Sequence, residues 1–203
     1  MRSLSEIDTI SKRALRAKGF SWGISEEIGK SVKQLELFGL PGLKNLNQYL
    51  KVYEQNKFQR IKIISKTNIS ENKFHCPIST GIGFLDQIKS LEKLNSVEFN
   101  KIAYPILFLS FVSRASEVLG KKIMIKMDEK EFILNFNQSI FGNYYKNEIW
   151  ENANTILINF LENNNSFSEE EWKEMNKFAN ETFVDESDEL KQKSAGAGLT
   201  DND

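Results

Sequence analysis

The sequence predicts an α+β fold, in which a helical N-terminal third packs with a small antiparallel sheet around a buried central helix. Apolar residues between 24 and 38 recur at helical spacing. Residues 121–137 alternate like a β-hairpin. Residues 106–119 begin apolar on every side, which is typical of a helix in the core. We therefore expect a single domain over residues 1–185 and a C-terminal arm over residues 186–203.

The N-terminal third contains signals for three helices. Ser3 and Glu6 have the spacing of a capping box, and Gly19 ends the helix that they begin. Its buried face is predicted from the apolar residues Leu4, Ile7, Ala14 and Ala17. Ser21 begins the second helix, where Gly29 costs about 1 kcal/mol relative to alanine and so indicates close approach of another backbone. A third helix follows over about 43–54.

The middle of the chain alternates between helix and strand signals. An isoleucine-rich segment over 58–65 is predicted to be a strand, although its alternation is imperfect. Residues 75–83 are predicted to form a glycine-containing loop before a helix that includes Leu85 and Leu94. Pro105 suits the first turn of the central helix and Gly120 suits its end.

The C-terminal half carries the strongest strand signal. Residues 123–127 and 132–136 alternate on either side of a turn at Asp128, and a third strand near 155–161 is expected to extend this hairpin into an antiparallel meander. Ser168 then caps a helix from Glu169 to about residue 183.

Composition limits the classes of function. With 27 basic and 28 acidic residues the net charge is -1, so no field attracts polyanions, and we expect no nucleic-acid partner. The single cysteine excludes an intramolecular disulfide, and the first residues lack the apolar core of a signal peptide. The longest apolar run is far shorter than the roughly 20 residues that span a bilayer. These features predict a soluble, cytoplasmic protein with no membrane contact.

Standard catalytic and cofactor motifs are missing. His75 and Cys76 are the only histidine and cysteine, and as neighbours they cannot build a usual zinc site. The sequence has no nucleophile elbow, P-loop or dinucleotide fingerprint. We therefore predict neither a cofactor nor a metal site built from histidine and cysteine, and an enzyme would have to use carboxylates, lysine, tyrosine or backbone groups.

The predicted loop over 75–83 is the first candidate site. Backbone N–H groups near a helix start, with nearby hydroxyls, bind phosphate or carboxylate. The candidate ligand-binding residues are Ser79, Thr80, Gly81 and Gly83. His75 is the candidate catalytic acid or base. The alternative is a loop that needs glycines only to turn, with Cys76 as a small buried residue.

Trp22 and Glu26 form the second candidate site. They lie one helical turn apart, so an indole face and a carboxylate could line one pocket for a cationic or amide-bearing ligand. Glu26 is also the second candidate catalytic residue. In the alternative interpretation Trp22 is a core aromatic, and the acids only complement the helix dipole.

The third candidate is the C-terminal arm. Its small residues precede Asp201 and Asp203, which are candidate ligand-binding residues. Such an arm could dock into another subunit, close over a site, or offer oxygen ligands to Mg²⁺ or Ca²⁺. A solubilising tail is the alternative.

Several short strings resemble an uncharacterised bacterial family, a domain of unknown function. They are SLSEI at 3–7, SWGISEEIG at 21–29, GLPG at 39–42 and GAGLTDND at 196–203. Weaker matches lie at 76–81 and 105–107. The sequence DELKQK at 188–193 departs from the more apolar, arginine-containing run that the resemblance implies. The family has no known activity, so the resemblance implies no site residues.

Two hypotheses about function follow. The first is a ligand-binding or accessory subunit that acts through self-association or a protein partner, with the C-terminal arm as a contact. The alternative is a small-molecule metabolic enzyme without a standard motif that uses carboxylates and His75. Convergence of the three candidate segments in one cleft would favour the enzyme.

Overall fold

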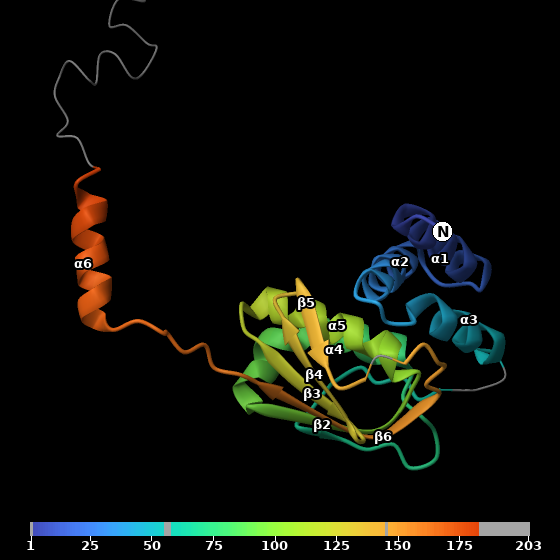
Figure 1. Cartoon of the computed structure of the whole chain (residues 1–203). Helices are drawn as coiled ribbons and strands as arrows, with labels where there is room; N and C mark the ends of the chain where they lie inside the picture. Colours follow the sequence, from blue (N-terminus) through green and yellow to red (C-terminus); the bar gives the residue numbers. More distant parts are fainter. Residues whose placement is uncertain (1, 55–57, 145, 183–203) are drawn as a thin grey trace, which may run out of the picture. The chain divides into compact units, whose positions relative to one another are not determined.

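The computed structural model describes residues 2–54, 58–144 and 146–182, and the chain divides into two compact units, residues 1–163 and 164–203 (Figure 1). The predicted arm over 186–203 and the predicted division after residue 185 lie outside the described residues.

Three helices form the N-terminal part of the first unit: α1 (Leu4–Ala17), α2 (Trp22–Leu37) and α3 (Gly42–Val52). The capping box at the start of α1 is present, with Ser3 accepting from the Glu6 N–H and Glu6 accepting from the Ser3 N–H. Ser21 caps α2 by accepting from the N–H of Ile24. Local capping chemistry therefore fixes both helix starts, as predicted.

Helices α1 and α2 pack closely at Gly29, and this contact selects the buried face of α1. A Cβ on Gly29 would stand 2.6 Å from both the Asp8 Oδ1 and the Lys12 Cγ atoms. The residues of α1 that are buried are Ser11 and Leu15, whereas Leu4, Ala14 and Ala17 are exposed. The expected close approach of a backbone at Gly29 is confirmed, since the Asp8 carbonyl oxygen would stand 3.0 Å from that Cβ. Of the predicted face of α1, Ile7 packs against the core, but the prediction is wrong for the other three residues.

The sheet has six strands, in the order β1-β2-β6-β3-β4-β5. They are β1 (Thr67–Asn68), β2 (Ser96–Ala103), β3 (Ile123–Met127), β4 (Lys130–Asn135), β5 (Ser139–Gly142) and β6 (Asn152–Phe160). Strand β1 pairs parallel with β2, and all other pairs are antiparallel. The predicted β3–β4 hairpin and the third strand are confirmed. Strand β6 is not the next strand of a meander, because it lies between β2 and β3.

Two strand predictions differ from the structure. Residues 58–65 form no strand, and Ile63 is 81% exposed, so the isoleucines there do not share a buried face. Strand β2 was not predicted from its residues. Its alternation breaks at Lys101, which has a positive φ of 53° and no partner in the register between Asn100 and Ile102. This bulge brings Ile102 and Ala103 together into the core.

Helices α4 (Pro77–Leu91) and α5 (Pro105–Leu119) contact the sheet, and a short 3-10 turn (Glu92–Leu94) follows α4. Figure 1 shows both helices on the same side of the sheet. Pro105 stands in the first turn of α5, and Gly120 ends it in the left-handed conformation. Helix α5 is buried along most of its length, which confirms the predicted central helix and the α+β class.

The second unit contains α6 (Glu169–Asn180), which begins with a second capping box between Ser168 and Glu171. Trp172, Met175 and Phe178 lie on one side of this helix and are exposed. In the part of the chain that the structure describes, no helix combines the length and the apolar character needed to cross a membrane.

Candidate functional site

A cavity of about 430 Å³ lies between the start of α2 and the start of α4. Its volume is within the range of small-molecule sites. The lining residues come from three segments of the first unit: Gly19, Phe20, Ser21 and Ile24; Tyr53, Arg60, Ile61 and Lys62; Cys76, Ile78, Ser79, Ile82 and Gly83. The cavity therefore brings together the beginnings of two helices that are more than fifty residues apart in sequence.

Aromatic rings build one wall of this cavity. The rings of Phe20 and Tyr53 are 4.8 Å apart, and Tyr53 also contacts Tyr49 at 5.4 Å between ring centroids. Tyr49 lies behind the lining residues, with its hydroxyl 3.2 Å from the Cys76 Sγ atom. Burial, and then the neighbouring Cys76, raise the pKa of Tyr49. Tyr49 is therefore a neutral structural phenol that supports the wall.

Polar groups gather at the mouth of the cavity. The Arg60 guanidinium donates to the Tyr53 hydroxyl at 3.0 Å, so the cation is tied to the aromatic wall. Lys62 is the second cationic lining residue, and the lining residues that the structure describes include no carboxylate. Helix α4 has no side-chain cap at Cys76. Its first N–H groups therefore remain available, as at any uncapped helix start.

The predicted glycine loop over 75–83 is wrong, because residues from Pro77 onward are helical. Gly81 serves packing, since a Cβ there would stand 2.2 Å from the Phe111 ring. Thr80 is fully buried, and neither it nor Gly81 lines the cavity. Ser79 and Gly83 do line it. The segment therefore contributes two of its four predicted ligand-binding residues, from a helix rather than from a loop.

His75 is a core residue in this structure. Its side chain is 2% exposed, packs edge-on against Phe99 with 6.1 Å between ring centroids, and does not line the cavity. Neither ring nitrogen has a hydrogen-bond partner among the described residues. Burial lowers the pKa of His75, and the backbone of Asn68 opposes this change only in part. A neutral, enclosed imidazole gives no geometric support to the predicted acid–base role.

Trp22 and Glu26 lie beside the cavity but do not line it. Trp22 is 67% exposed, and the Arg16 guanidinium carbon lies 4.6 Å from the centroid of its ring. Glu26 is also exposed. The structure therefore does not join them into one pocket, and Trp22 is not the core aromatic of the alternative interpretation either.

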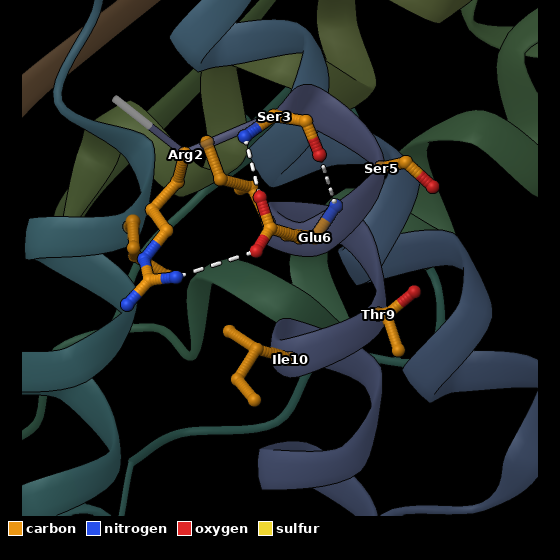
Figure 2. Close-up of a pocket in the computed structure, with 8 residues that line it drawn as sticks. Arg2, Ser3, Ser5, Glu6, Thr9 and Ile10 are labelled. Carbon is orange, nitrogen blue, oxygen red and sulfur yellow. Dashed lines mark hydrogen bonds and ion pairs between the residues drawn. The ribbon is translucent and has the colours of Figure 1, made fainter.

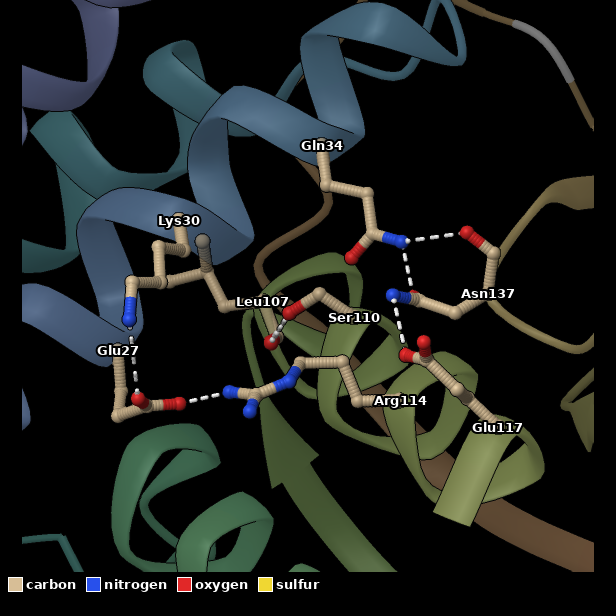
Figure 3. A network of polar contacts seen from close by, with 8 residues as sticks. All are labelled: Glu27, Lys30, Gln34, Leu107, Ser110, Arg114, Glu117 and Asn137. Atoms are coloured by element: carbon tan, nitrogen blue, oxygen red, sulfur yellow. Dashed lines mark hydrogen bonds and ion pairs between the residues drawn. The ribbon is translucent and has the colours of Figure 1, made fainter. Parts of the chain in front are cut away.

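The neighbouring acid, Glu27, has a structural role. Its carboxylate forms an ion pair with Arg114 of α5 across the α2–α5 interface and another with Lys30 of its own helix (Figure 3). Further along the same interface, Gln34 donates to Asn137, which in turn donates to Glu117 (Figure 3). This network holds the N-terminal helices against α5 and the β4–β5 turn.

The predicted ligand residues Asp201 and Asp203 lie outside the described residues, so their convergence with the other segments stays a prediction. Within residues 2–54, 58–144 and 146–182, no three histidine, cysteine, aspartate or glutamate side chains gather in a way that could hold a metal ion.

Two further hollows, of about 560 and 630 Å³, adjoin each other along α1 and α3. Both are lined by Ile10 and Leu43. In the hollow of Figure 2 the polar groups already bind one another: Glu6 accepts from the Ser3 backbone at 2.8 Å and from Arg2 at 3.4 Å. Because these groups are engaged in capping, we consider the α2–α4 cavity the better candidate, although it is smaller.

Tyr53, Arg60 and Lys62 were not predicted as site residues. Exposed basic residues after a helix are ordinary, and no local pattern distinguishes Arg60 or Lys62 in the sequence. The sequence indicated the site only through neighbouring residues. The predicted ligand-binding residues Ser79 and Gly83, and Ser21 at the predicted start of a helix, all line the cavity.

Residues 2–74 match a family described as a protein of unknown function (DUF3726). The match supports the resemblance to an uncharacterised family over the N-terminal part of the chain, and it includes the aromatic wall and the cationic mouth of the cavity. No curated protein and no solved structure matches the chain.

Proposed function

We propose that this protein is a small-molecule-binding protein without catalytic activity, and that its ligand occupies the α2–α4 cavity. The observation that supports this proposal is the construction of the cavity, where an aromatic and aliphatic interior is combined with a few polar groups at the mouth. Such a combination is typical of ligand sites, since apolar surface supplies affinity and a few polar groups fix orientation.

Binding is favoured over catalysis by the positions of the acid–base candidates. The enzyme hypothesis relies on His75 and carboxylates, but His75 is buried and neither His75 nor the exposed Glu26 is among the lining residues. The hydroxyls in the cavity belong to Ser21, Tyr53 and Ser79, and the described lining residues include no histidine, aspartate or glutamate that could act on them as general base.

An occlusion experiment tests the cavity directly. Ser79 lines the cavity on α4, whereas Ser90 is exposed on the same helix outside it. We would screen a fragment library by NMR, following the backbone amides of Ser21 and Ser79 in the unmodified chain. Fragments that shift these amides should lose binding to Ser79→Phe and keep it with Ser90→Phe.

The control separates loss of the site from loss of the fold. Both substitutions place a phenylalanine on α4, so equal thermal stability of the two variants shows that a difference in binding arises in the cavity. Hits that bind Ser79→Phe as well as the unmodified chain, or a screen in which no fragment shifts the cavity amides, would contradict the proposal.

A second candidate function is association with another chain through α6, and a different observation supports it. Trp172, Met175 and Phe178 form an exposed apolar face on a helix whose other residues are mainly charged. Met175 is 62% exposed, and an uncovered face of this kind is typical of docking helices. We include in this candidate the predicted contact through the C-terminal arm, which follows α6.

Self-association through α6 can be measured by sedimentation equilibrium over a range of concentrations. Met175→Glu places a charge on the apolar face, and Lys173→Glu introduces the same side chain on the charged side of the helix. A mass above that of one chain, lowered by Met175→Glu but not by Lys173→Glu, supports self-association. A single-chain mass for all three proteins contradicts it.

A further inference from the structure

The charges at the cavity mouth all have one sign. Among the described residues of the lining, Arg60 and Lys62 carry charge, and none is an aspartate or glutamate. The overall net charge of the chain is only -1, so this positive site is a local feature and does not reflect a generally basic protein. A ligand that carried a positive charge would meet two like charges without compensation.

Arg60 is positioned to bind an anion. Its guanidinium donates one hydrogen bond to the Tyr53 hydroxyl at 3.0 Å, and a guanidinium has five N–H donors in total. The remaining donors face no carboxylate in any ion pair described for the first unit. The contact with Tyr53 therefore orders the cation beside the cavity without neutralising it.

The backbone at the start of α4 adds N–H donors, which carry a positive partial charge and also favour an anion. Cys76 is the N-cap residue, its side chain makes no capping hydrogen bond, and Pro77 occupies the first turn. The next two N–H groups, of Ile78 and Ser79, belong to cavity-lining residues at the positive end of the helix dipole. Like the two side-chain cations, these donors favour an anionic group.

The interior of the cavity demands an apolar body on the ligand. Ile24, Ile78 and Ile82 line it together with the ring of Phe20, which packs 4.8 Å from the ring of Tyr53. A free inorganic anion would leave this surface uncovered. A purely apolar molecule would instead leave the cations without a partner.

We infer that the ligand is a small organic anion, with a carboxylate or phosphate group held by Arg60 and Lys62 at the mouth and an aromatic or branched apolar body inside the cavity. This inference rests on the proposed function and specifies the class of molecule that it binds. Anionic oxygens satisfy guanidinium, ammonium and backbone N–H donors at once, and burial of the apolar body contributes the remaining affinity.

Four probes of similar size test the inference: phenylacetate, phenyl phosphate, 2-phenylethanol and 2-phenylethylamine. Their dissociation constants would be measured by NMR titration of the cavity amides in the full chain at low salt. We expect both anions to bind at least about 10-fold more tightly than the alcohol, since hydrogen bonds to charged groups are stronger than those between neutral groups. The amine should bind most weakly. Whichever anion binds more tightly identifies the head group.

A matched pair of double variants assigns the preference to the mouth. Arg60→Gln with Lys62→Gln removes both cations, whereas Lys66→Gln with Lys89→Gln makes the same change in net charge at exposed positions outside the cavity. In the Arg60 and Lys62 double variant the anions should bind no more tightly than 2-phenylethanol. In the Lys66 and Lys89 double variant they should still bind at least about 10-fold more tightly than the alcohol. Equal thermal stability of the two double variants excludes unfolding as the cause.

The experiments distinguish a wrong ligand class from a wrong binding site. If the alcohol binds in the cavity as tightly as the anions, or if the Arg60 and Lys62 variant keeps the anion preference, the cavity is still a binding site but the anionic class is wrong. If none of the four probes shifts the cavity amides and the fragment screen is also empty, both are wrong.

Discussion

Gly29 of α2 lies so close to Asp8 of α1 that a Cβ at this position would stand 2.6 Å from the Asp8 Oδ1 atom and 3.0 Å from the Asp8 carbonyl oxygen. Alanine gains about 1 kcal/mol of intrinsic helix stability over glycine, but here it must push α1 away from α2. Because overpacking costs about 1–3 kcal/mol, we expect Gly29→Ala to lower the free energy of unfolding. Urea denaturation measures the change.

The control is Gly23→Ala on the same helix. No atom lies within 4 Å of a Cβ at Gly23, so the substitution should leave the protein equally stable or more stable. Equal behaviour of the two alanine variants would show that α1 and α2 are not packed as described.

A similar pair lies on α4, and it tests the finding that the predicted loop is a helix. At Gly81 a Cβ would stand 2.2 Å from the ring of buried Phe111, whereas at Gly83 the nearest atom would be 3.6 Å away. We expect Gly81→Ala to destabilise the protein by about 2 kcal/mol or more through overpacking. Gly83→Ala should be stabilising, by up to about 1 kcal/mol, because it only improves helix propensity. The melting temperatures of both variants test this prediction. A lower melting temperature for Gly83→Ala than for the unmodified chain would indicate that the segment is a loop.

His75 should make the stability depend on pH. Burial lowers the pKa of His75 in the folded protein below the value near 6.5 of the unfolded chain. Above about pH 6.5 the imidazole is neutral in both states, and stability is at its full value. As the pH falls below this value, the unfolded state takes up a proton that the folded state resists, so stability declines by up to about 1.4 kcal/mol per pH unit.

The measurement is the free energy of unfolding between pH 5 and 8, for the unmodified chain and for His75→Leu. The variant should lose this part of the acid sensitivity, because neither ring nitrogen has a partner to be lost among the described residues. His75 is the only histidine, so its ring resonances titrate without overlap. A ring that titrates at or above pH 6.5 in the folded protein would refute the prediction.

Asp128 should stabilise the sheet through β6. Its carboxylate accepts from the backbone N–H groups of Asn154 and Thr155, at 3.0 and 2.9 Å, and thereby ties the β3–β4 turn to the neighbouring strand. We expect Asp128→Gly to cost about 1 kcal/mol by loss of these bonds, although glycine suits the positive φ of 51° at this position. The change is measured by chemical denaturation.

Lys101 provides the opposite case for comparison. Its φ of 53° is equally unfavourable for a residue with a side chain, but within the described part of the chain the Lys101 Nζ atom makes a single, exposed hydrogen bond, to the Glu71 carbonyl. Relief of a left-handed conformation amounts to about 1 kcal/mol, so Lys101→Gly should not destabilise the protein. If both glycine variants lose the same stability, the Asp128 bonds contribute nothing.

Elements whose signals are local could be predicted from the sequence. The capping box at Ser3, the helix cap at Ser168 and the boundaries of α5 at Pro105 and Gly120 depend on neighbouring residues, and all four are confirmed. The missed elements depend on distant ones. Strand β2 was hidden because the bulge at Lys101 interrupts its alternation, and its central pairing partner lies some fifty residues further along.

Glycine was the most misleading residue type in predicting the candidate site. A glycine that turns the chain and a glycine that admits a neighbouring side chain are identical in the sequence, and only the ring of Phe111 shows that Gly81 is of the second kind. The cavity, too, depends on contacts between segments that are distant in the sequence. Arg60 and Ser79 line one cavity although they belong to different segments of the chain, and no spacing in the sequence indicates this.

The position of β6 has a consequence for biosynthesis. This strand is the last of the sheet to be translated, yet it joins β2 to β3 at the centre. Until the ribosome has released residue 160, the nascent polypeptide therefore holds two separate half-sheets, each with an open edge that can recruit another strand. Chaperone dependence should concentrate in this interval, and expression fragments that stop before residue 152 should form inclusion bodies, whatever the stability of the helices that precede them.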